Sequence, residues 1–268
     1  MLAAAVAILL VHTAVGMLGS AAVARAPAGP GFYRMTLLIA VAGLALGFGL
    51  RFGPAAASMP PLGTVAAAGY GLSGVGLVIF GSGLHAGARP RFAVLTGAAI
   101  AGLLGVAADP VITGSAASSG FGRALYAAGL AGVVPAVGSV LFAMLLAHWY
   151  LVEPRMPLAP LQRVLALFAA SEALVLLSMA GVVAYHWPEW TSMEGGLARA
   201  FTLGNALFVA MRAFLGVLAP IGLAWMTWKT VEIRSIQSAT GILYAAVVFV
   251  LFGETICIYL SLATGQPY

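Results

Sequence analysis

Three ionisable residues lie inside long apolar runs of this sequence. Glu172 lies in LFAASEALVLL, Arg212 in LFVAMRAFLGV and Glu254 in VLFGETICIYL. A charged side chain near the centre of a bilayer costs at least about 2.5 kcal/mol, so each is expected to face a partner or water. Two carboxylates and one guanidinium leave one carboxylate without a cationic partner. Because a buried carboxylic acid can exchange protons near neutral pH, the unpaired glutamate is a candidate proton or cation site.

Helical periodicity places other polar side chains on the same faces as these charges. At about 100° per residue, Thr202, Asn205, Arg212 and Gly216 share an arc of about 80° on one helix. Thr240, Tyr244 and Glu254 share a similar arc on the next helix. We therefore expect Asn205, Thr240 and Tyr244 to line the interior around the charges. The structural alternative is that one glutamate forms a salt bridge with Arg212 and only orients the helices.

The four histidines, His12, His85, His148 and His186, suggest a second chemistry. Membrane cytochromes of b type hold haem between histidines on different helices at similar depth. His85 and His148 would form one such pair near one membrane surface, and His12 and His186 a poorer pair towards the other. No spacing motif supports haem or metal ligation, and no cofactor is predicted from the residues alone. Binding of b-type haem, a quinone or a metal therefore remains an alternative.

Recognised catalytic motifs do not account for the chemistry of this chain. Gly69, Gly71 and Gly74 match GxGxxG, but a dinucleotide site needs a preceding strand, so close helix packing is the better interpretation. No HExxH motif, P-loop or Ser/His/Asp constellation is present. Cys257 is the single cysteine, which excludes a disulfide framework within the chain. No catalytic residue is predicted, and the chain is not expected to be an enzyme.

Three other features have simple structural interpretations. Pro220 in LGVLAPIGLAW removes a backbone donor and frees a carbonyl. Such prolines occur both at hinges of transporters and in ordinary membrane helices. Asp109 in VAADPVI is expected to end a helix before proline. The run WKTVEIR, residues 228–234, is expected to be a loop at the membrane surface.

The elements that must position these residues are membrane-spanning helices. Of the 268 residues, 62% are hydrophobic and 7% charged, whereas a soluble domain is roughly 25% charged. We predict an all-α, polytopic integral membrane bundle, one transmembrane domain of about eight helices without an extramembrane domain. The expected spans are about 2–24, 34–52, 61–83, 91–108, 124–151, 158–186, 198–226 and 236–263.

The distribution of basic residues predicts the orientation of the bundle. Alternate connections carry eight Lys or Arg residues on one side and three on the other. The richer side is expected to be cytoplasmic by the positive-inside rule. Both termini would then face outward from a bacterial inner membrane. The two sets are Arg25, Arg34, Arg89, Arg91, Arg155, Arg163, Lys229 and Arg234 against Arg51, Arg123 and Arg199.

These observations favour a transport or energy-transducing component that handles protons or a cation-coupled solute through Glu172, Arg212 and Glu254. Two other classes stay open: a redox subunit that binds haem or quinone, and a non-catalytic scaffold of a larger membrane complex. The expected partners are the lipid bilayer and other membrane subunits or copies of the chain. The basic residues are distributed singly between spans, so nucleic acid is not an expected partner.

Overall fold

The computed structural model describes residues 2–53, 61–83, 88–109, 120–192 and 203–264, and every regular element within them is helical. This confirms the predicted all-α class. The elements are α1 (Leu2–Ala24), α2 (Pro30–Phe52), α3 (Pro61–Ser82), α4 (Ala88–Ala108), α6 (Gly120–Val152), α7 (Ala159–Ser192), α9 (Leu203–Ala213), the π-helical turn η2 (Phe214–Leu218), α10 (Ala219–Glu232) and α11 (Ile236–Thr264).

The helices of the described chain have the length and composition of membrane spans. Seven helical stretches are long and apolar enough to cross a bilayer, and α9, η2 and α10 together supply one of them, Ala206–Glu232. In α4 the apolar stretch is the shorter Phe92–Ala108. Large apolar side chains point outward, such as Leu38 (69% exposed), Leu104 (63%) and Val248 (65%). Lipid tails can solvate such an apolar surface, whereas exposing it to water would be unfavourable. The protein is therefore a multi-pass integral membrane protein.

Two helices extend well beyond their predicted C-terminal ends, and α2, α4 and α6 begin a few residues before their predicted starts. α7 continues past residue 186 to Ser192, with Pro188 inside it. α10 continues past residue 226 to Glu232, so most of the run predicted as a surface loop is helical. Trp228 Nε1 donates to Glu232 Oε1 (2.8 Å), and Lys229 Nζ pairs with Glu232 Oε2 (2.9 Å). Residues three and four apart are neighbours on a helix surface. These two contacts therefore stabilise the last turn of α10, although its sequence is more polar than that of the preceding span.

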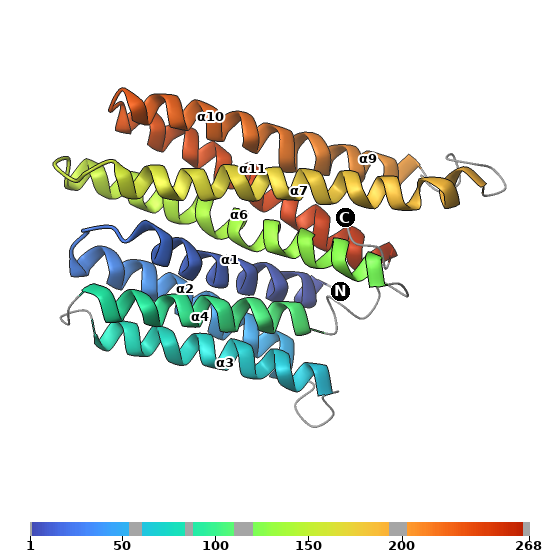
Figure 1. Ribbon diagram of the computed structural model, residues 1–268, viewed down its shortest axis with the longest axis horizontal. Helices are drawn as coiled ribbons and strands as arrows, with labels where there is room; N and C mark the ends of the chain where they lie inside the picture. Colours follow the sequence, from blue (N-terminus) through green and yellow to red (C-terminus); the bar gives the residue numbers. More distant parts are fainter. Residues whose placement is uncertain (1, 54–60, 84–87, 110–119, 193–202, 265–268) are drawn as a thin grey trace.

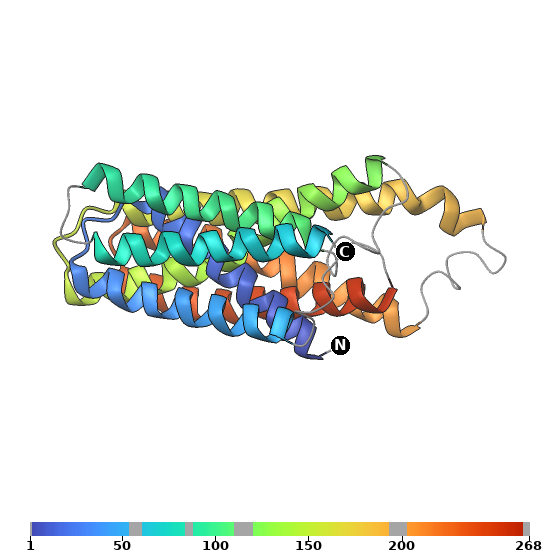
Figure 2. The same ribbon diagram turned by 90° about the horizontal axis from the view of Figure 1, so that it is seen from below.

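The helices run side by side along the long axis of the molecule (Figure 1). α1 and α6 pack together in the middle, with α2, α3 and α4 on one side and α7, α9, α10 and α11 on the other. α1 begins and α11 ends at the same end of the bundle, which we call the terminal end (Figures 1 and 2). The opposite end carries the connections 25–29, 153–158 and 233–235. An early and a late helix can therefore both contribute to one interior site.

Glycine pairs allow two of these helix contacts to be unusually close. A Cβ built on Gly16 of α1 would lie 2.9 Å from Gly138 Cα of α6, and one on Gly69 of α3 would lie 2.6 Å from Gly105 Cα of α4. Small residues let membrane helices approach to backbone contact. The packing interpretation of the GxGxxG match thus holds at Gly69, although Gly71 has open space around it.

We expect Gly16→Ala to destabilise the bundle, because the added methyl group would overlap backbone atoms of Val134 and Gly138. Overpacking of this kind typically costs about 1–3 kcal/mol. The free energy of unfolding in detergent micelles measures the effect. Gly222→Ala is the matched control, since nothing lies within 4 Å of its Cβ position. Equal stability of the two variants would contradict the close contact of α1 with α6.

Candidate functional site

A buried pair joins the first helix to the last. His12 Nδ1 of α1 lies 2.7 Å from Glu254 Oε1 of α11, and 242 positions separate the two residues. The residues are 2% and 1% exposed. The other polar atoms, His12 Nε2 and Glu254 Oε2, are buried and have no hydrogen-bond partner among the described residues. The sequence identified Glu254 as a costly intramembrane charge and His12 as a possible haem ligand but did not pair them.

The π-helical turn positions Arg212. In an α-helix the N–H of Pro220 would bond to the carbonyl of Gly216, but proline has no N–H. Arg212 Nη1 donates to that Gly216 oxygen instead (3.1 Å). Gly216 also lies against Gly253, since a Cβ on Gly216 would be 2.7 Å from Gly253 Cα. The turn therefore holds the guanidinium beside the part of α11 that carries Glu254.

Glu172 of α7 completes a cluster of four titratable side chains. It is 1% exposed, and its Oε2 has no hydrogen-bond partner among the described residues. The charges of Arg212 and Glu254 both act on its carboxyl group. The structure thus brings the three predicted charges into electrostatic range of one another and adds His12. We call His12, Glu172, Arg212 and Glu254 the charge cluster.

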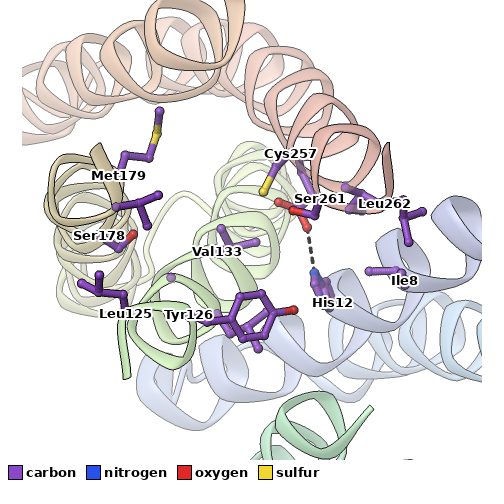
Figure 3. Close-up of a pocket in the computed structure, with 15 residues that line it drawn as sticks. Ile8, His12, Leu125, Tyr126, Val133, Ser178, Met179, Cys257, Ser261 and Leu262 are labelled. Carbon is purple, nitrogen blue, oxygen red and sulfur yellow. Dashed lines mark hydrogen bonds and ion pairs between the residues drawn. The ribbon is translucent and has the colours of Figure 1, made fainter. Parts of the chain in front are cut away.

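A cavity of about 60 Å³ opens beside the charge cluster. His12 and Glu254 line it, and the dashed line at His12 in Figure 3 marks their contact. Tyr126 extends into the same cavity with its hydroxyl directed towards His12 (Figure 3). A water molecule needs about 10–15 Å³ of such space, so the volume accommodates several. Ser178, Cys257 and Ser261 complete the polar lining.

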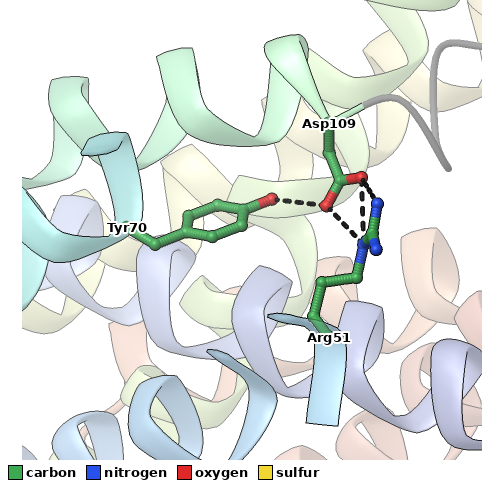
Figure 4. Close-up of polar contacts among 3 residues, drawn as sticks. All are labelled: Arg51, Tyr70 and Asp109. Carbon is green, nitrogen blue, oxygen red and sulfur yellow. Dashed lines mark hydrogen bonds and ion pairs between the residues drawn. The ribbon is translucent and has the colours of Figure 1, made fainter. Parts of the chain in front are cut away.

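A second buried ion pair, Arg51 with Asp109, was not foreseen (Figure 4). Arg51 of α2 donates to Asp109 through Nη2 (2.7 Å) and Nε (3.1 Å), and Tyr70 of α3 donates to the same carboxylate (3.4 Å). Asp109 therefore ties the ends of α2 and α4 together rather than only ending a helix. The sequence did contain an indication of this pair. Arg51 and Asp109 carry opposite charges at the C-terminal ends of two helices that run in the same direction. Tyr126 lies within electrostatic range of both Asp109 and Glu254.

The expected polar lining is only partly assembled. Tyr244 is 50% exposed and faces outward, which contradicts its predicted place in the interior. Tyr244 and Glu254 lie at opposite edges of the predicted arc and about 15 Å apart along the helix, so α11 can bury one and expose the other. Thr240 is buried, and its hydroxyl donates to Ile236 of its own helix (2.8 Å). Asn205 is in α9, but its side chain lies outside the described residues.

The remaining histidines occupy separate places. His148 is exposed near the end of α6, and its suggested partner His85 lies outside the described residues. His186 packs edge-on against Tyr185, with ring centroids 4.9 Å apart. Within the described part of the chain, no group of three or more His, Cys, Asp or Glu side chains is arranged to hold a metal ion.

Charge counting gives two neutral arrangements of the charge cluster. With both carboxylates ionised and His12 protonated, the four groups carry two positive and two negative charges. The same balance holds if His12 is neutral and one glutamate is protonated. The two arrangements differ only in which group carries one proton. Comparison with protein families, curated proteins and solved structures finds no match for this chain.

Proposed function

We propose that this protein is a membrane transport or energy-transducing component whose charge cluster handles protons. The observation that carries the proposal is the buried His12–Glu254 contact of 2.7 Å beside a cavity. Histidine and glutamate are the side chains that most readily exchange protons near neutral pH when buried together. His12 Nε2 and Glu254 Oε2 are buried and have no hydrogen bond to a described residue. Water in the cavity could form hydrogen bonds with both atoms.

Proton movement is coupled to other movements through the net charge of the cluster. Removing the shared proton leaves the cluster with a net negative charge in a low-dielectric interior, which is costly. The cluster then favours re-entry of a proton, entry of another cation, or a rearrangement that exposes it to water. Arg212 can compensate whichever glutamate is ionised, because its charge acts on Glu172 and it lies beside the Glu254 segment. Proton movement can thus be linked to movement of the helices or of a solute.

The cavity favours access from the terminal end. Its lining comes from the parts of the four helices α1, α6, α7 and α11 between their middle and that end. If the basic connections face the cytoplasm, as the positive-inside rule predicts, protons reach the cluster from the outer side. Both termini would then face outward from the inner membrane of a bacterium.

We expect Cys257, which is half-buried, to react with a small, membrane-impermeant thiol reagent from the terminal side of oriented vesicles, more slowly than an exposed cysteine does. Cys257 lines the cavity and is the single cysteine of the chain, so labelling reports on this space alone. Mass spectrometry of the intact protein measures the adduct. Cys257→Ser should stay unlabelled. In that background, Ser238→Cys, exposed at the opposite end of α11, should react only from the other side. Labelling of Cys257 from that other side alone would contradict the proposed access.

The direct test of the function is reconstitution of the purified protein into vesicles that contain a pH-sensitive dye. An imposed pH gradient should collapse faster than in protein-free vesicles. A reduced-minus-oxidised spectrum of the same preparation tests the haem alternative through its b-type absorption band. A colourless protein without proton flux that purifies with other subunits would favour the scaffold.

A further inference from the structure

A long groove at the opposite end of the bundle is separate from the charge cluster. It has a volume of about 590 Å³ and lies between α4 and the start of α7, with α1 as its floor. The floor is made of small residues, Gly19 and Ala22, and Ala99 of α4 faces Gly19 closely. The other lining residues are Val23, Arg25, Thr96, Ile100, Leu103 and Arg163.

Two arginines line this groove, Arg25 directly after α1 and Arg163 of α7. Arg163 of α7 donates through Nη1 to the carbonyl of Ala24, the last residue of α1 (3.0 Å). Arg25 follows in a left-handed conformation (φ 47°) and donates through Nε to Ala22 (3.4 Å). These bonds fix the positions of both guanidinium groups, and both side chains are exposed. Among the described residues, no acidic side chain lines the groove.

The wall of the groove is apolar below the arginines. The Thr96 hydroxyl donates a hydrogen bond to the carbonyl of Phe92 in its own helix (2.9 Å), so Thr96 contributes its methyl group to the groove wall. From Thr96 to Leu103 the wall extends about 10 Å along the axis at 1.5 Å per residue. One leaflet contributes half of a hydrocarbon core about 30 Å thick, so the wall spans most of the thickness of one leaflet's acyl chains.

We propose that the groove binds one anionic phospholipid, with its phosphate between Arg25 and Arg163 and an acyl chain along α4. A guanidinium binds phosphate oxygens in bidentate fashion, and basic pockets between membrane helices suit acidic headgroups. The groove lies at the end with the larger number of basic residues, where anionic headgroups are attracted. A helix of a second copy or of a partner would leave both guanidinium groups facing apolar surface, which disfavours that occupant.

The test measures lipid-dependent stability of the whole protein after removal of bound lipid in detergent. Phosphatidylglycerol should raise the melting temperature in a saturable way, whereas phosphatidylcholine with the same acyl chains should not. Arg25→Gln should weaken the effect roughly tenfold in lipid concentration, as expected for loss of one charged contact. The bond that this variant breaks is local, from Arg25 to Ala22 three positions earlier, so its fold should be retained. Arg155→Gln, at the same end but outside the groove, is the matched control.

A second variant tests the acyl-chain part of the proposal. Ala99→Leu narrows the groove without removing an arginine, and it should also weaken the phosphatidylglycerol effect relative to its own lipid-free baseline. The proposal is overturned if inorganic phosphate alone stabilises as well as the lipid, or if Arg25→Gln and Arg155→Gln behave alike. It is also overturned if Arg25→Gln changes the oligomeric state and not the lipid response. None of these outcomes depends on proton flux.

Discussion

Replacing Glu254 with glutamine is expected to abolish proton movement into vesicles that contain the protein. Glutamine has nearly the size of glutamate and can still accept a hydrogen bond from His12, whose Nδ1 lies 2.7 Å from the present carboxylate. It cannot take up or release a proton at physiological pH. The dye-detected rate should therefore fall to that of protein-free vesicles while the helices stay in place.

Glu153→Gln is the matched control for this measurement. Glu153 lies at the opposite end, is exposed, and accepts a hydrogen bond from Trp149 Nε1 (3.3 Å). The same chemical change there should leave the flux at the wild-type rate. Wild-type flux in Glu254→Gln, with unchanged helical content and a monodisperse elution profile, would show that the His12–Glu254 pair is structural.

Replacing Arg212 with methionine is expected to cause the largest loss of stability of any single substitution in the charge cluster. Methionine fills a similar volume but leaves Glu172 and Glu254, each 1% exposed, without the guanidinium that compensates them. Removing one partner of a buried charged group typically costs about 3–5 kcal/mol. It also leaves the Gly216 carbonyl without its donor. Unfolding of the purified protein by denaturant in micelles measures the loss.

A double-mutant cycle separates charge from packing. Glu172→Gln in the Arg212→Met background removes one of the uncompensated carboxylates, so the double variant should be more stable than Arg212→Met alone. Arg155→Met, an exposed arginine at the opposite end, should have little effect by itself. Strictly additive losses in the cycle would mean that Arg212 stabilises the helix turn and not the carboxyl group of Glu172.

Hydropathy was sufficient to predict the helices. α1 begins and ends where its apolar run does, and α11 ends within one residue of its predicted limit. A membrane span must be apolar over its length, so composition alone determines these boundaries. The predicted ends were wrong for α7 and α10, because polar and aromatic side chains near a membrane surface can remain helical.

The partner of each buried charge could not be predicted in the same way. Helical periodicity indicates which face of a helix carries a residue, but not which helix lies opposite that face. Glu254 was expected to act with Glu172 and Arg212, yet its hydrogen-bond partner is His12 in the first helix. Pro220 did indicate a freed carbonyl. That Arg212 fills it depends on the π-helical turn, which has no sequence signature of its own.

The contact between the first and last helices also concerns the order of biosynthesis. His12 enters the membrane with α1, and 242 positions separate it from Glu254. During that interval its imidazole must be hydrated or borrow a temporary partner, and Arg212 inserts before Glu254 as well. The hydrogen bonding of the interior is therefore completed only when α11 inserts. Glu172 can compensate Arg212 before that point, but a chain arrested before α11 would leave His12 in the membrane without its partner Glu254.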